Sequence, residues 1–369
     1  MPKEAPTPKY IFRGHTAQVN TLVIFSDNTA LSSGDADGNV LVWDLKTRRT
    51  TVRWKAHEDG VLELQEWGDK LITHGRDNKI HVWDLTTPDS LTTGNPLFSL
   101  PVNALNFCKF SSCSTEIDDD DDLLVAVPSI IDTSMIDIFS LRHQTRLWAY
   151  IGARPLSAPP SKEPPRTGLC MALRLFRRDG RLYLLAGFES GGLVLWRLRD
   201  GETRMEGEGA DSRRVLIRDG VAEMVWEVKE HNEVVLAIDI SPDTRHAIST
   251  SADDKIVKYS ILDGPAASSD DLVTGSITLK HAGVSDVRIR SDGRIFATGG
   301  WDGRIRIFSL KTLKPLATLA YHRESVYALA FAPVFDPEEE GESTKDEVAQ
   351  KHYVVGAGKD ERISLWEIY

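Results

Sequence analysis

The sequence predicts an all-β fold, a closed ring of seven four-stranded sheets called a seven-bladed β-propeller. One short unit, a strand, a tight turn and a second strand ending in an aromatic residue, recurs along the 369 residues. Units of roughly 40–50 residues fill the chain about seven times, as expected for one propeller. No apolar run approaches the ~20 residues of a membrane-spanning helix, and the N-terminus lacks the apolar core of a signal peptide. We therefore expect a single domain, 1–369, with no membrane contact.

The repeating unit is clearest at residues 33–45. It reads as a strand ending at Ser33, a turn on Asp37-Gly38, and a second strand closing on Trp43. Asp and Gly tolerate the positive φ angles of a tight hairpin turn, and Val40 and Val42 alternate as in a sandwiched strand. The local chemistry therefore predicts a β-hairpin at this point.

The same spacing recurs in five units, each with an Asp six residues before an aromatic residue and a His upstream. The Asp–aromatic pairs are Asp37–Trp43, Asp77–Trp83, Asp253–Tyr259, Asp302–Phe308 and Asp360–Trp366, and the histidines are His15, His57, His231, His281 and His322. With Gly14 before His15, the pattern resembles the GH…WD signature of the WD40 repeat. One match would be weak evidence, but five in register are strong.

The resemblance to WD40 repeats implies a buried hydrogen-bond chain in each blade. In it, the indole N–H donates to a Ser or Thr hydroxyl, the hydroxyl bonds the His, and the His bonds the Asp. Complete sets are expected in two blades: His15, Ser33, Asp37 and Trp43; and His57, Thr73, Asp77 and Trp83. Partial sets are expected in three: His231, Ser249 and Asp253; His281, Thr298 and Asp302; and His322, Asp360 and Trp366, where Gly356 lacks the hydroxyl. The same residue types form catalytic triads, but a triad occurs once, so the repetition favours a structural role and no enzyme activity.

The blades are assigned from the spacing of the units. They cover 16–54, 59–100, 101–152, 168–229, 232–280, 282–320, and 323–369 together with an N-terminal strand at 8–14 that closes the ring. Blades 3 and 4 are the most degenerate, so six or eight blades are alternatives, and the inner strand of blade 3 is placed at 102–107. Five inserts interrupt the pattern, at 111–122, 153–167, 199–221, 263–272 and 334–350.

Two of the inserts carry the acidic charge of the chain. The net charge is −11, of which Glu116 and residues 118–122 contribute −6, and residues 336–347 another −6. The remainder is close to neutral, which disfavours duplex nucleic acid as a direct partner. Both inserts join inner strands to their neighbours and therefore lie on the lower face. They are either solvated insertions or contacts for a basic patch on a partner protein, and the candidate contact residues are Asp118, Asp119, Asp120, Asp121, Asp122, Glu338, Glu339 and Glu340.

Other residues give weaker signals. Cys108 and Cys113 resemble half of a metal site, but no second Cys/His pair accompanies them, so no metal or cofactor is expected. His74 and Arg76 flank a turn and are candidates for a recognition spot on the upper face, although such turn residues are usually solvated. Between the two faces, the insert-rich lower one is preferred for a partner.

Several longer stretches resemble a known family. They are PTPKYIFRGH at 6–15, SGDADG at 33–38, WKAH at 54–57, THGRD at 73–77 and GKDERISLW at 358–366. Together they resemble the fungal ASTRA-associated protein 1 family, which is similar to the animal G-protein β-subunit-like protein 1. The resemblance implies a non-catalytic subunit of the ASTRA assembly in the nucleus, with the cytoplasm as a second candidate location. The sequence indicates no homo-oligomer, so we expect a monomeric subunit of a hetero-complex. Its implied partners are ASTRA subunits, Hsp90-linked kinase-maturation adaptors and phosphatidylinositol-3-kinase-related kinases, with links to chromatin remodelling and telomere maintenance.

Two other propeller classes remain alternatives. Ubiquitin-ligase substrate receptors often carry an Arg two residues after the Trp-Asp pair, but Lys46 and Thr86 stand there. G-protein β subunits carry a long N-terminal coiled-coil helix, whereas about nine residues precede the first predicted strand.

Overall fold

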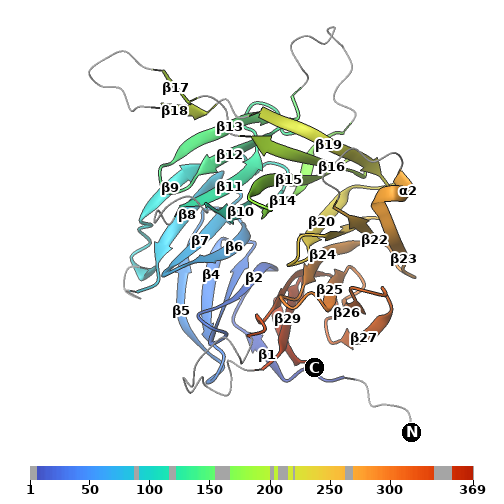
Figure 1. The fold of residues 1–369 in the computed structure, drawn as a ribbon. Coiled ribbons are helices and arrows are strands. Elements are labelled where there is room, and N and C mark those ends of the chain that lie inside the picture. The colour runs from blue at the N-terminus through green and yellow to red at the C-terminus, as the bar shows by residue number, and fades with distance from the viewer. Residues whose placement is uncertain are drawn as a thin grey trace.

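The computed structural model describes residues 6–86, 91–115, 122–153, 167–199, 203–206, 215–218, 221–261, 269–335 and 351–368. These residues form seven antiparallel four-stranded sheets around a common axis (Figure 1). The innermost strand of each sheet faces the axis, and β2 contacts the inner strands of both neighbouring blades. The predicted seven-bladed propeller is confirmed.

Blades 1 to 3 use consecutive strands. Blade 1 consists of β2 (Val19–Phe25), β3 (Ala30–Asp35), β4 (Asn39–Asp44) and β5 (Arg49–Lys55). Blade 2 consists of β6 (Val61–Trp67), β7 (Lys70–Gly75), β8 (Lys79–Asp84) and β9 (Phe98–Pro101). Blade 3 consists of β10 (Ser111–Ser114), β11 (Leu123–Pro128), β12 (Ile136–Ser140) and β13 (Thr145–Ile151).

Blades 4 to 6 follow the same order, with additions. Blade 4 consists of β14 (Cys170–Arg178), β15 (Arg181–Phe188), β16 (Gly192–Arg199) and β19 (Val221–Lys229). Between β16 and β19, the hairpin of β17 (Thr203–Glu206) and β18 (Val215–Arg218) projects from the ring (Figure 1). Blade 5 consists of β20 (Val235–Ile240), β21 (His246–Ser251), β22 (Lys255–Ser260) and β23 (Val273–Thr278), with the short helix α2 (Ser269–Leu272) before β23. Blade 6 consists of β24 (Val284–Ile289), β25 (Ile295–Gly300), β26 (Arg304–Ser309) and β27 (Pro315–Ala320).

Blade 7 joins the two ends of the chain, as predicted. It consists of β28 (Val326–Phe331), β29 (Tyr353–Gly358), β30 (Arg362–Glu367) and, outermost, β1 (Tyr10–Arg13). Tyr10 lies opposite Leu365 in the β1–β30 register, and Phe12, 1% exposed, packs against Trp43 of blade 1. The N-terminal strand therefore covers the sheet edge that β30 would otherwise expose.

One predicted strand was wrong. Residues 102–107 form no strand, and the inner strand of blade 3 is β10, which pairs Ser111 with Ala126. The side chains of Asn103 and Asn106 instead bond backbone carbonyls of Ser129 and Cys170, and Phe107 has a φ of 60°. These contacts fold the segment into a loop. The first four residues of the predicted insert 111–122 are therefore strand, and its residues 116–121 lie outside the described part.

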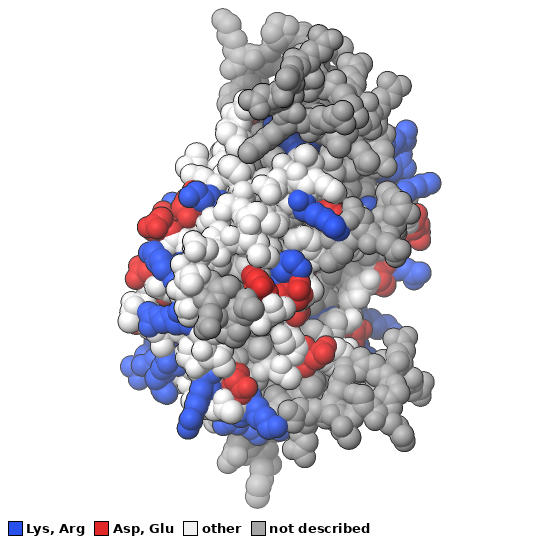
Figure 2. Space-filling model, turned by 90° about the vertical axis from the view of Figure 1, so that its left-hand side faces the viewer, with Lys and Arg blue, Asp and Glu red and all other residues white. Residues whose placement is uncertain are grey.

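The charge on the side of the ring is mixed. Figure 2 shows Lys and Arg interspersed with Asp and Glu on the side that carries blades 1 and 2. Among the described residues, no helix is both long and apolar enough to cross a membrane.

Candidate functional site: the upper face and the central cavity

The His-centred hydrogen-bond chain is complete in blade 2. His57 Nδ1 lies 2.9 Å from Asp77 Oδ1, His57 Nε2 lies 2.7 Å from Thr73 Oγ1, and Trp83 Nε1 donates to the same hydroxyl over 2.9 Å. Burial raises the pKa of Asp77, but the bond and charge of His57 outweigh it and hold that pKa below its usual value. The set links β7, β8 and the connection before β6, as the sequence predicts.

Blade 1 uses a different Asp from the predicted one. His15 Nδ1 lies 2.7 Å from Asp35 Oδ2, while His15 Nε2 and Trp43 Nε1 both bond Ser33 Oγ. Asp37 is exposed in the turn, where its backbone N–H donates to Asp35 Oδ1 over 3.0 Å. The prediction of Asp37 was therefore wrong, because Asp35 ends β3 on the buried side and also closes the turn.

Blades 5 and 7 complete their sets with substitutes that the sequence did not reveal. In blade 5, His231 bonds Asp253 and Ser249, and the Tyr259 hydroxyl, 3.1 Å from Ser249 Oγ, takes the place of the indole. In blade 7, His322 bonds Asp360, and the missing hydroxyl comes from Ser364 on β30, which also accepts from Trp366 Nε1 over 2.8 Å.

Blade 6 lacks the predicted set. His281 is exposed, and Asp302 pairs instead with Arg306, at 2.5 Å. Thr298 is buried and makes no side-chain hydrogen bond with either of these two described residues. Phe308 has no N–H or O–H to donate, so the hydroxyl of Thr298 is not needed as a relay, and the prediction for His281, Thr298 and Asp302 was wrong.

These sets cannot act on a substrate. The Ser33, Asp35 and Thr73 side chains are completely buried, and each hydroxyl is saturated by its indole and imidazole partners. The atoms of His57, Asp77 and His81 lie within 4.8 Å of one another, close enough for a metal ion. Both His57 nitrogens are already bonded, however, and His81 Nδ1 lies 2.7 Å from Ser99 Oγ. The arrangement is that of a blade-stiffening network.

Charged residues of the inner strands form a second network at the axis. Glu63 on β6 lies 3.2 Å from Lys109 and 3.0 Å from Arg288 of β24, and Arg174 of β14 lies 3.0 Å from Asp239 of β20. Burial raises the pKa of Glu63, but the Lys109 and Arg288 charges hold it below its usual value. The network ties blades 2, 4, 5 and 6 together across the axis.

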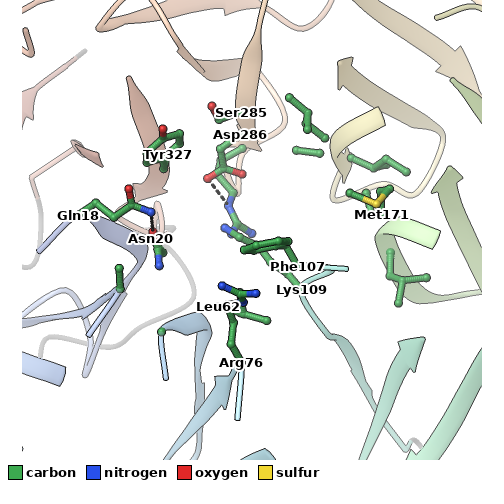
Figure 3. A pocket seen from close by; sticks show the side chains of 18 of the residues that line it. Gln18, Asn20, Leu62, Arg76, Phe107, Lys109, Met171, Ser285, Asp286 and Tyr327 are labelled. Carbon is green, nitrogen blue, oxygen red and sulfur yellow. Dashed lines mark hydrogen bonds and ion pairs between the residues drawn. The ribbon is translucent and has the colours of Figure 1, made fainter. Parts of the chain in front are cut away.

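Above this network, on the face formed by the turns between second and third strands, the axis opens into a cavity of about 360 Å³. Its lining includes apolar residues such as Leu62 and Met171 and the aromatic residues Phe107, Trp301 and Tyr327. It also includes the charged residues Asp59, Lys109, Arg174, Asp286 and Arg288. Figure 3 shows Arg76 and Phe107 converging on this cavity from the blade 2 turn and the loop before β10. The guanidinium carbon of Arg76 lies 4.0 Å from the centre of the Phe107 ring. The cavity therefore has a lining that is partly apolar and partly charged, with the Arg76–Phe107 pair at its mouth.

Of the residues predicted as recognition spots, Arg76 lines the cavity and His74 does not. His74 is completely buried, and both of its ring nitrogens lack a hydrogen-bond partner. Burial, with the nearby His57 charge, lowers its pKa to about 3, so the ring is neutral at physiological pH. The prediction that His74 lies on a recognition surface was wrong.

The acidic contact residues lie mostly outside the described residues. This applies to Asp118, Asp119, Asp120, Asp121, Glu338, Glu339 and Glu340. Asp122 is described and is 8% exposed, with Oδ2 accepting from Ser140 Oγ over 2.6 Å and Oδ1 from the Arg142 amide over 3.0 Å. It closes a turn of blade 3, so its assignment to a partner contact was wrong.

The three cysteines form no disulfide with one another. Cys108 neighbours Cys170 rather than pairing with Cys113, and burial followed by the hydrogen bond with Cys108 raises the pKa of Cys170. The two buried thiols therefore pack between the blade 3 loop and β14 as small apolar groups.

Comparisons with known proteins match the whole propeller. The family model described as ASTRA-associated protein 1 matches residues 8–367. The protein of that name from Verticillium alfalfae is 32% identical, over 99% of this chain and 94% of its own length. The Schizosaccharomyces pombe protein is 30% identical, over 99% of each. The mouse guanine nucleotide-binding protein subunit beta-like protein 1 is 28% identical, over 99% of this chain and 97% of its own. The chain thus belongs to the ASTRA-associated protein 1 family.

Proposed function

We propose that this chain is a non-catalytic scaffold subunit of the ASTRA assembly. The observation that carries the proposal is the match to ASTRA-associated proteins from β1 through β30, which includes the strand that closes the ring. The buried His-centred sets support a structural role, because their reactive atoms are saturated inside the blades.

In this proposal the propeller acts by binding. A closed ring whose blades are fixed by buried networks presents a rigid surface, and binding energy at such a surface is concentrated in a few residues. The partners are the other ASTRA subunits, the Hsp90-linked adaptors that mature phosphatidylinositol-3-kinase-related kinases, and those kinases themselves. Through them the chain contributes to chromatin remodelling and telomere maintenance in the nucleus, with a further cytoplasmic pool. The mixed charge on the side shown in Figure 2 favours protein partners over nucleic acid.

The test is affinity purification from the native cell with quantitative mass spectrometry. The tag is placed at the C-terminus on a long linker, because β30 lies between β29 and the closing strand β1. Enrichment of ASTRA subunits, kinase-maturation adaptors and the large kinases is expected, and depletion of the chain should lower the steady-state level of those kinases. Enrichment of cullin-ligase or G-protein subunits instead would contradict the proposal.

A further inference from the structure

The upper face of blade 3 exposes a group of large apolar side chains. Leu105 and Phe107 lie in the loop before β10, Ile130 and Ile131 in the turn between β11 and β12, and Leu169 just before β14. Their exposed fractions are 70%, 56%, 64%, 73% and 37%, respectively. We call these five residues the blade 3 patch. Exposed apolar side chains grouped on one face in this way mark interaction sites in soluble proteins.

The backbone that carries the blade 3 patch is fixed. Asn103 Nδ2 donates to the Ser129 carbonyl over 2.6 Å, Asn106 bonds the Cys170 carbonyl, and the Ala104 amide donates to Asn78 Oδ1 over 3.0 Å. The loop is thereby tied to blades 2, 3 and 4 at once. Its apolar side chains are exposed on a backbone that these bonds hold in place, and a surface held in this way loses little conformational freedom on binding.

The conformation of Phe107 is a second sign of function. Its φ of 60° is left-handed, which is unusual for an aromatic residue. Its ring is more than half exposed and carries the Arg76 guanidinium on its face, at the mouth of the central cavity. Backbone strain of this kind concentrates at binding sites, where the rest of the structure maintains it.

Arg76 is the cation at the cavity that lacks a carboxylate. Lys109 and Arg288 share Glu63, and Arg174 pairs with Asp239. Arg76 has no ion pair with any described residue, and its Nε is buried without a hydrogen-bond partner. No described carboxylate pairs with Arg76, so its guanidinium is open to a carboxylate of a partner.

We propose that the blade 3 patch and the adjoining cavity bind a segment of a protein partner that carries a carboxylate beside large apolar side chains. The apolar side chains cover Leu105 and Ile131 and enter the cavity beside Phe107, and the carboxylate pairs with Arg76. An apolar core with a bidentate charge pair at its edge is the usual composition of a binding hot spot. This inference deepens the proposed function and rests on it only for the identity of the partner. It places the contact on the upper face, against the sequence-based preference for the lower one.

The first experiment identifies the occupant in living cells. The photo-reactive residue p-benzoylphenylalanine replaces Leu105 in one strain, and Leu316, 57% exposed on β27, in a control strain. A crosslink at position 105 to one partner segment that contains Asp or Glu beside apolar residues, absent at position 316, is the expected result. No crosslink at position 105, or the same crosslinks at both positions, would overturn the proposal.

The second experiment tests the charge pair directly. The probe is a synthetic peptide of the crosslinked segment, titrated against the purified full chain by fluorescence anisotropy. Arg76→Glu should weaken binding by about tenfold or more, as for a partly desolvated pair, and a peptide with its acidic residue changed to Arg should regain affinity for that variant. Leu316→Asp is the matched surface control and should bind as the wild type does. Equal affinity of wild type and Arg76→Glu would refute the assignment.

The two proposals fail separately. In quantitative co-purification, loss of ASTRA partners with Ile131→Asp or Arg76→Glu but not with Leu316→Asp supports both. Retention of those partners by every variant refutes the upper-face site and leaves the proposed function intact. A different result is that the chain crosslinks to a protein outside the ASTRA assembly, binds it in the charge-swap experiment, and recovers no ASTRA partner as the wild type. That result refutes the proposed function but supports the upper-face binding site. Urea unfolding midpoints of the variants, expected to match the wild type, exclude misfolding as the cause.

Discussion

His74 should make the stability of the propeller depend on pH in a way that one substitution removes. The ring is completely buried beside Phe110, at a centroid distance of 5.9 Å, and neither nitrogen has a partner. Its pKa is lowered to about 3 from 6.5, so below pH 6.5 the unfolded chain binds a proton that the folded chain does not. The stability associated with a neutral His74 is therefore fully present above pH 6.5 and is lost as the pH falls towards 3. One pKa unit corresponds to about 1.4 kcal/mol, so the loss at pH 5 is roughly 2 kcal/mol.

The test replaces His74 by Leu. At pH 8 the change removes two unpaired polar atoms, each costing about 1–3 kcal/mol when buried, and is expected to be neutral or stabilising. At pH 5 the variant should gain roughly a further 2 kcal/mol relative to the wild type. Urea unfolding followed by Trp fluorescence at both pH values measures the difference, and His281→Leu, at an exposed position, is the control that should show no such change. An advantage of His74→Leu that is equal at pH 5 and pH 8 would refute the reasoning.

Three further predictions concern the networks and the ring closure, and each is read as the free energy of unfolding from denaturant titration. Asp35→Asn should cost about 2–4 kcal/mol, because it disrupts the bond to His15 and the carboxylate that accepts from the turn amides. Asp37→Asn, at an exposed position, should cost less than about 1 kcal/mol. The reverse order would show that the exposed Asp is the network member. Phe12→Ala should cost about 3–5 kcal/mol and speed proteolysis at the closing blade, because the ring is buried between β1 and blade 1; unchanged protease sensitivity would count against closure by β1. Glu63→Ala should cost about 3–5 kcal/mol because Lys109 and Arg288 share this carboxylate inside the ring, and a loss below about 1 kcal/mol would show that solvent reaches the axial network.

The position of the patch could not be inferred from local pattern. Residues 102–107 alternate as they would in a strand. Val102, Ala104 and Asn106 would lie on one side of that strand, and Leu105 and Phe107 on the other. In the structure, the Asn103 side chain bonds the backbone carbonyl of Ser129. The Asn106 side chain bonds the carbonyl of Cys170, which lies 64 residues further along the chain. Those tertiary contacts outweigh the local preference and turn the second set of side chains outward.

The sequence by itself determined the propeller, its seven blades and its closure, because the repeat pairs turn residues and aromatic residues at fixed spacing and each blade buries a local β-meander. It also determined the blade 2 network, whose four members are separated as the repeat requires. Only the tertiary structure decided that Asp35 replaces Asp37, that Ser364 and Tyr259 supply missing groups, and that Arg76 meets Phe107 over a shared cavity. The physical reason is that hydrogen-bond partners and cavity walls are chosen by distance and direction across neighbouring strands and blades, which a one-dimensional spacing does not specify.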